Sequence, residues 1–243
     1  MGYKTKISWC QTSQNFWIGC TKVDPGCDNC YMFRDMRRYG NDPEKVRRTK
    51  TTFNNPLKWK KPRLIFTCSW GDFFHVDADP WRDEAWDIIR RTPHHTYQIL
   101  TKRHGRIQKN LPSWWPMSHV WLGVSGCDND GFHQRAKALR DVPGNFTRFI
   151  SAEPLIGPID VTAEQLVDYK INWMIIGGES GPGARPMELS WAKTIKDACV
   201  EANIPVFLKQ LGGHPSKRAD EAALLDGQLW TQMPHTFNQL ELL

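Results

Sequence analysis

Short apolar runs that end at polar residues recur along this chain, and they most constrain how it can fold. Each run is rich in β-branched or aromatic residues and ends in, or just short of, Gly, Ser, Thr or a charged residue. The runs are 63–69 (RLIFTCS), 96–101 (TYQILT), 120–125 (VWLGVS), 148–152 (RFISA), 172–177 (NWMIIG) and 205–209 (PVFLK). Segments of helical character lie between them, at 80–91, 131–140 and 190–202. Strands that alternate with helices predict repeated βα units and a parallel sheet.

The length of 243 residues suits one such α/β domain, and no linker or internal repeat of sequence divides it. We therefore expect a single domain over 1–243. The units either close into a full or partial barrel or lie open as a doubly wound sheet. In both arrangements, function gathers at the carboxyl ends of the strands.

Polar residues stand at or just past the end of each run, and parallel strands would bring them to one mouth. They are Ser69, Asp72, Lys102, Arg103, Ser125, Glu153, Glu179, Ser180, Lys209 and Gln210. Loop polar residues also cap helices, which is the alternative interpretation of each. Ten such groups at six strand ends exceed what capping ordinarily requires, so we expect a site there.

The cysteines point to a metal or cluster site rather than to disulfides. Their number is odd, at seven, and three of them fall within GCTKVDPGCDNCYMF. Cys27 and Cys30 have the two-residue spacing that can clasp one metal, and the turn-forming 24–26 (DPG) can bring Cys20 round to them. On spacing alone, three interpretations stay open: a [4Fe-4S] cluster with one open iron, a zinc ion with a fourth ligand from elsewhere, or no metal.

Charge and composition bear on partners and location. The net charge is +6, basic residues cluster at 45–50 (KVRRTK) and 58–63 (KWKKPR), and there are twelve Trp residues. Basic charge attracts phosphate backbones and aromatic rings can stack bases, although solvated basic faces and a Trp-rich core explain the same composition. No run approaches the roughly 20 apolar residues of a membrane span, and the N-terminus has no apolar signal core. We expect a cytoplasmic protein with no membrane partner.

The motifs resemble, over nearly the whole chain, a phage and bacterial family of three-cysteine proteins. That family is grouped with the radical S-adenosylmethionine (SAM) enzymes and was long described as a domain of unknown function. The matching residues are Trp9, GCTKVDPGCDNCY, FTCSWGDFFH (66–75), ILTKR (99–103), WLGVS (121–125), SAEPLIGPI (151–159), IIGGESGPGARPM (175–187), PVFLKQLGG (205–213) and DGQLWTQMP (226–234). The resemblance implies a partial (β/α) barrel of six or seven parallel strands, with a cluster loop at 20–30 after the first strand. It also implies a [4Fe-4S] cluster on Cys20, Cys27 and Cys30 whose open iron binds SAM.

A second, shorter resemblance is to spore photoproduct lyase, a radical enzyme that repairs thymine dimers. Tyr31 directly follows the third cysteine, as in that enzyme, and Thr101-Lys102 matches its Thr-Lys pair at a strand end. The resemblance implies that Lys102 contacts the cofactor carboxylate. Ser69 and Ser125 are similar to its strand-end serines.

The remaining candidates come from strand-end chemistry. The turn Gly177-Gly178-Glu179 can bring backbone close to the cofactor or substrate, with Glu179 as a ligand. Glu153 can bind ribose hydroxyls or transfer a proton, unless it pairs with Arg148 or Arg185. The residues assigned to the substrate are Asp72, Arg103, Lys209 and Gln210. The chain departs from the commonest radical pattern, since six residues rather than three separate its first two cysteines and its Gly-Gly-Glu motif follows a late strand.

The resemblance implies a radical SAM enzyme that modifies or isomerises a hypermodified thymidine or other pyrimidine base in phage DNA. Its partners would be DNA and an external electron donor of the flavodoxin or ferredoxin type. One alternative is a radical SAM lyase that repairs pyrimidine photoproducts in DNA. Another, from a different class, is a zinc-stabilised nucleic-acid-binding module without catalysis.

Overall fold

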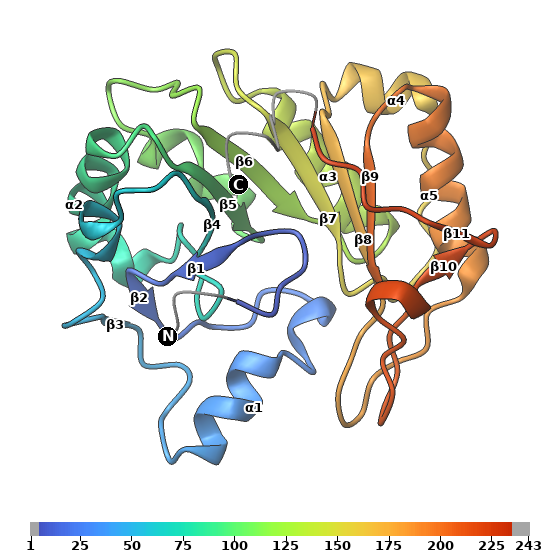
Figure 1. The fold of residues 1–243 in the computed structure, drawn as a ribbon, viewed down its shortest axis with the longest axis horizontal. Coiled ribbons are helices and arrows are strands. Elements are labelled where there is room, and N and C mark those ends of the chain that lie inside the picture. The colour runs from blue at the N-terminus through green and yellow to red at the C-terminus, as the bar shows by residue number, and fades with distance from the viewer. Residues whose placement is uncertain (1–4, 235–243) are drawn as a thin grey trace.

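The computed structural model describes residues 5–234, which form a curled half-barrel built on one sheet of seven parallel strands (Figure 1). The sheet order is β1-β4-β5-β6-β7-β8-β9. The strands are β1 (Thr12–Gln14), β4 (Leu64–Thr67), β5 (Thr96–Thr101), β6 (Val120–Ser125), β7 (Arg148–Ala152), β8 (Trp173–Gly177) and β9 (Val206–Gln210). The predicted α/β partial barrel is confirmed. Six of the strands coincide with the apolar runs, whereas β1 is short and polar and carries no such signal.

Helices cover the outer face of the sheet, as each chain segment returns from the end of one strand to the start of the next (Figure 1). They are α2 (Asp79–Arg91), α3 (Asn129–Arg140), α4 (Ala163–Asp168) and α5 (Leu189–Glu201). Their ends follow local chemistry: the Asp128 side chain caps α3, and Thr162 and Gln165 form a reciprocal capping box at α4. Helix α1 (Tyr31–Arg38) stands apart from this outer layer, directly after the third cysteine of the loop.

The remaining elements are small. Strand β2 (Trp17–Ile18) pairs antiparallel with β3 (Arg47–Arg48), and β10 (Leu224–Leu225) pairs antiparallel with β11 (Gln228–Leu229). Short 3-10 helices lie at η1 (Pro25–Cys27), η2 (Asn55–Lys58), η3 (Val76–Ala78), η4 (His104–Arg106), η5 (Gln108–Asn110) and η6 (Asp220–Ala222).

The hydrophobic core lies on both faces of the sheet. The larger part fills the space between the strands and the outer helices. A smaller, aromatic part fills the concave face, where Trp9, Trp121 and Trp173 pack with Phe149 and Phe207. These buried Trp rings are core residues, so they are not available to stack bases. They form a floor beneath the carboxyl ends of the strands.

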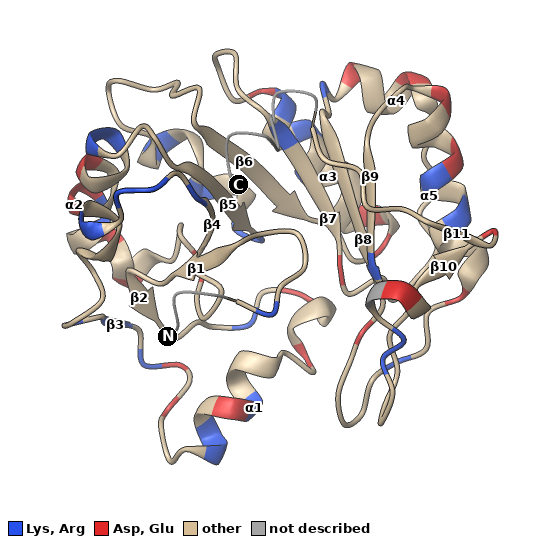
Figure 2. Ribbon diagram, viewed as in Figure 1, with Lys and Arg blue, Asp and Glu red and all other residues tan. Residues whose placement is uncertain are grey.

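The fold separates the two basic runs (Figure 2). The run 58–63 leads directly into β4, so it lies at the amino ends of the strands. The run 45–50 contains β3, which pairs with the segment that follows β1. Only the second run therefore lies on the side of the carboxyl ends, where the cysteine loop also lies.

Candidate functional site

A cavity of about 680 Å³ opens at the carboxyl ends of the parallel strands. Its lining includes Cys20, Cys27 and Cys30. It also includes every strand-end polar residue that the sequence singled out, namely Ser69, Asp72, Lys102, Arg103, Ser125, Glu153, Glu179, Ser180, Lys209 and Gln210. Tyr31 and Gly178 line it as well. The structure thus places these residues at one mouth, while their individual roles stay predictions.

The cysteine loop turns tightly just before α1 begins. The backbone N–H of Cys27 donates to the carbonyl of Asp24 at 3.0 Å, and Cys30 directly precedes the first helical turn. Gly26 is required by a close approach, because a Cβ there would stand 2.3 Å from the Cys127 sulfur. Within residues 5–234, no three or more His, Cys, Asp or Glu side chains are gathered into a group that could hold a metal ion.

Three arginines from three different βα units hold this loop. Arg103, after β5, donates to the carbonyl and hydroxyl oxygens of Thr21 at 2.9 and 2.7 Å. Arg135, on α3, pairs with Asp24 at 2.5 Å. Arg185, after β8, donates to the Pro25 carbonyl at 2.8 Å. The geometry of the loop is therefore imposed by the barrel rather than by the loop alone.

Lys102 reaches across to the next strand. Its ammonium group lies 2.7 Å from the Ser125 hydroxyl and 3.0 Å from the Cys127 sulfur. Ser125 in turn donates to the Glu153 carbonyl at 2.9 Å. Burial lowers the pKa of Lys102, but the nearby Cys127 and Asp24 outweigh it, so the pKa is raised overall and the side chain stays charged.

Glu153 forms a second polar group with two residues of β9. One of its carboxylate oxygens accepts from Lys209 at 2.6 Å and from Gln210 at 3.1 Å. The expected alternative pairing with Arg148 or Arg185 is not what the structure contains. Gly177 leaves room for this carboxylate, because a Cβ there would stand 3.2 Å from it. The side-chain oxygen of Gln210 is buried and has no hydrogen-bond partner among the described residues, so it offers an acceptor.

Two other carboxylates are occupied in holding the fold. Asp72 accepts from the Thr101 hydroxyl at 2.7 Å and from the Lys102 and Phe74 backbone at 3.1 and 2.8 Å. Glu179 accepts from Asn29 at 2.9 Å and from the Arg185 guanidinium at 2.6 Å. Burial raises the pKa of Glu179, but these hydrogen bonds outweigh it and lower the pKa overall. These contacts give Glu179 a part in anchoring the cysteine loop.

The remaining predicted residues frame the mouth. The Tyr31 hydroxyl donates to the Ser69 carbonyl at 2.5 Å, and the Ser69 hydroxyl accepts from Asn15 at 3.2 Å. Gly178 is needed for packing, since a Cβ there would stand 2.6 Å from the Leu211 carbonyl oxygen. Gly177, just behind it on β8, is not part of the cavity lining.

Sequence reasoning missed several of the residues that shape the site. Asn29, within the cysteine loop, donates to Glu179, and Arg135 pairs with Asp24 of the loop. Cys127 packs against Gly26. Asn29 and its partner Glu179 are separated by 150 positions. No local pattern could have pointed to such a contact.

Comparison with known proteins places the chain in a family. No curated protein matches the sequence, and no solved structure matches it. None of the helices in the described residues is both long and apolar enough to cross a membrane. The family model for "Protein of unknown function (DUF5131)" matches residues 4–234, which is nearly the whole chain, and the protein therefore belongs to the DUF5131 family.

Proposed function

We propose that this protein is a radical SAM enzyme that holds a [4Fe-4S] cluster on Cys20, Cys27 and Cys30. The observation that carries the proposal is the position of the three thiols, on one loop that lines a cavity at the carboxyl ends of a parallel half-barrel. Catalytic groups gather at this end of βα folds. The donor set also fits the group, since three thiolates leave the fourth iron open for a cofactor.

When bound, such a cluster together with SAM supplies a 5'-deoxyadenosyl radical that abstracts a hydrogen atom from substrate. The protein's own residues would bind and shield. The charged Lys102 at the cavity wall suits the cofactor carboxylate. Glu153 and the free acceptor on Gln210 suit hydroxyl or amide donors of the cofactor or substrate. The aromatic floor of the concave face closes the cavity from below, which helps to exclude water.

We propose a pyrimidine base in DNA as the substrate, to be modified or isomerised. The support is the net charge of +6 and the basic run 45–50 on the same side as the cavity. A base in duplex DNA would have to be flipped out to enter. Repair of a pyrimidine photoproduct is the alternative within the same chemistry. A cytoplasmic location and a low-potential electron donor of the flavodoxin or ferredoxin class belong to the same proposal.

A zinc-stabilised nucleic-acid-binding module without catalysis is the alternative from a different class. A single tetrahedral zinc ion holds its thiolates at about 2.3 Å and so draws them into one compact group. A fourth zinc ligand would have to come from elsewhere in the chain, and an assay of zinc and acid-labile sulfide distinguishes the two centres.

The decisive activity test is reductive cleavage of SAM. Anaerobically purified protein is mixed with SAM and dithionite, and 5'-deoxyadenosine is quantified with and without phage DNA. We expect release that requires all three cysteines and persists in Cys199→Ala, since Cys199 is buried on α5 away from the loop. A protein that carries its cluster but releases no 5'-deoxyadenosine would contradict the proposal.

A further inference from the structure

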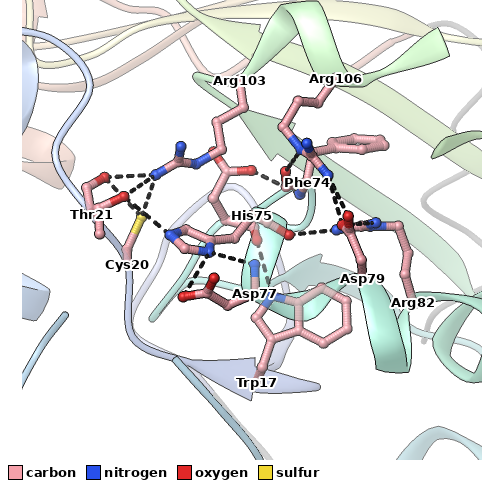
Figure 3. Close-up of polar contacts among 11 residues, drawn as sticks. Trp17, Cys20, Thr21, Phe74, His75, Asp77, Asp79, Arg82, Arg103 and Arg106 are labelled. Carbon is pink, nitrogen blue, oxygen red and sulfur yellow. Dashed lines mark hydrogen bonds and ion pairs between the residues drawn. The ribbon is translucent and has the colours of Figure 1, made fainter. Parts of the chain in front are cut away.

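Arg103 differs from the other two arginines that bind the cysteine loop, because its guanidinium has a different kind of partner. Arg135 is paired with the Asp24 carboxylate, and Arg185 with that of Glu179. Arg103 has no carboxylate within ion-pair distance in the part of the chain that the structure describes. Its guanidinium instead lies 3.9 Å from the Cys20 sulfur, within the hydrogen-bond limit for sulfur (Figure 3). A half-buried charge without a counter-ion is costly, so its partner is to be sought in what the site binds.

A network behind Cys20 fixes the position of Arg103. The Thr21 hydroxyl accepts from Arg103 at 2.7 Å on one side and lies 3.1 Å from Nε2 of His75 on the other (Figure 3). Nδ1 of His75 accepts from the Asp77 backbone N–H at 3.2 Å, so a neutral ring carries its hydrogen on Nε2 and donates to Thr21. His75 is itself buried. Thr21, next to Cys20, is thus held from two directions.

The same network is tied to the outer helices. Arg82, on α2, donates to the His75 carbonyl at 2.6 Å, and Arg106 donates to the Phe74 carbonyl at 2.8 Å (Figure 3). Both arginines also bind the Asp79 carboxylate. The segment that supports Thr21 is therefore held by contacts to Arg82 and Arg106, and the Arg103 guanidinium is directed to Thr21 and Cys20.

We infer that Arg103 is a positioning residue for the cluster: it fixes Cys20 through Thr21 and places its unpaired positive charge beside the Cys20 sulfur. Ligation converts the thiol to a thiolate, which supplies the missing counter-charge. Positive charge and hydrogen bonds near ligand sulfurs favour the more negative, reduced state of such a group. Arg103 therefore eases the uptake of one electron from a low-potential donor. This inference rests on the proposed function, and it assigns Arg103 to the cluster rather than to the substrate.

The test uses the full chain, reconstituted anaerobically with iron and sulfide, as wild type, Arg103→Gln, Arg103→Lys and Arg91→Gln. Arg91→Gln is the control for loss of one positive charge, because Arg91 lies exposed at the end of α2 and pairs with Asp87, outside the network that supports Thr21. The readouts are iron and sulfide per chain, and the midpoint potential from a dithionite titration followed by electron paramagnetic resonance. We expect the midpoint potential of the cluster to be lower in Arg103→Gln than in wild type. At the wild-type midpoint potential, the ratio of reduced to oxidised cluster should fall at least tenfold, which corresponds to about 59 mV for a one-electron couple.

Arg103→Lys keeps the charge but loses the planar fork, so we expect it to recover more than half of that shift. Arg91→Gln should match wild type. A wild-type potential in Arg103→Gln, or an equal shift in Arg91→Gln, would overturn the inference. If Arg103→Gln binds no iron, the iron content of Arg103→Lys and Thr21→Val decides the question. Iron binding that is restored in Arg103→Lys supports the positioning role. Equal loss of iron in both Arg103 variants, together with wild-type iron content in Thr21→Val, contradicts it. A wild-type protein without iron and sulfide would instead refute the proposed function itself.

Discussion

Replacing Gly26 with alanine tests the geometry of the cysteine loop at its tightest point. The new Cβ would stand 2.3 Å from the Cys127 sulfur, more than an ångström short of the 3.4 Å at which ordinary contact begins. It would also meet the Cys127 Cβ at 3.0 Å and an Asp24 carboxylate oxygen at 3.1 Å. Both the loop and Cys127 are buried there, so neither side can move without disturbing its neighbours.

Overpacking of this kind costs about 1–3 kcal/mol of unfolding free energy. We therefore expect Gly26→Ala to destabilise the protein by that amount in urea unfolding of chelator-treated protein, in which metal binding adds nothing to the free energy. The displacement falls next to Cys27, so iron uptake on reconstitution should fall as well. Gly105→Ala is the matched control, because a Cβ at Gly105 meets nothing within 4 Å.

A second substitution, Cys127→Ala, separates steric crowding from any other cost of placing alanine at position 26. Cys127→Ala removes the sulfur that causes the closest contact, so the double variant should lose less stability than the two single variants together. Neighbours of this kind couple by about 0.5–3 kcal/mol. Additive losses, or a Gly26→Ala protein as stable as Gly105→Ala, would refute the packing of the loop against Cys127.

Three further predictions concern the cavity and the fold. Lys102→Ala should weaken SAM binding in calorimetry and leave iron content unchanged, because Lys102 lies at the cavity wall and is not a thiol; unaltered affinity would remove it from the cofactor site. Trp173→Ala should cost roughly 3–5 kcal/mol of unfolding free energy because it removes the central ring of the aromatic floor, while Trp114→Ala, at a residue that is 43% exposed, should cost less. Burial, together with His94, lowers the pKa of His95 from 6.5 to about 4 in the folded protein. As the pH falls, His95 is therefore protonated at a higher pH in the unfolded chain than in the folded protein. The unfolding free energy should therefore drop by up to about 3 kcal/mol between pH 6.5 and 4. His95→Gln should flatten this drop and the exposed His214→Gln should not, and equal slopes in both would contradict the assignment.

The sequence was most informative where a pattern repeats. Buried parallel strands are apolar on both faces, so six of the seven strands could be predicted from apolar runs in the sequence. Strand β1 reads TSQ, and it is a strand only because β4 pairs with it. The gathering of polar residues at one mouth was predictable for the same reason, since parallel strands bring their carboxyl ends together.

Side-chain direction was not predictable in this way. Arg103 was expected at the substrate, yet its guanidinium turns to Thr21 and Cys20 because their loop folds over the end of β5. Glu179 was expected as a ligand and is occupied by Asn29 and Arg185. Such contacts join residues far apart in sequence, and they depend on a tertiary arrangement that no spacing encodes.

The most direct test of the account is the metal and sulfide content of the protein purified without oxygen. Iron, acid-labile sulfide and zinc are assayed in wild type, in Cys20→Ala, Cys27→Ala and Cys30→Ala, and in Cys199→Ala, with an absorbance spectrum of each. The account predicts about four iron and four sulfide per chain in wild type and Cys199→Ala, and loss of both in each of the other three variants. One zinc with no sulfide, or full iron in any of those three variants, would contradict it.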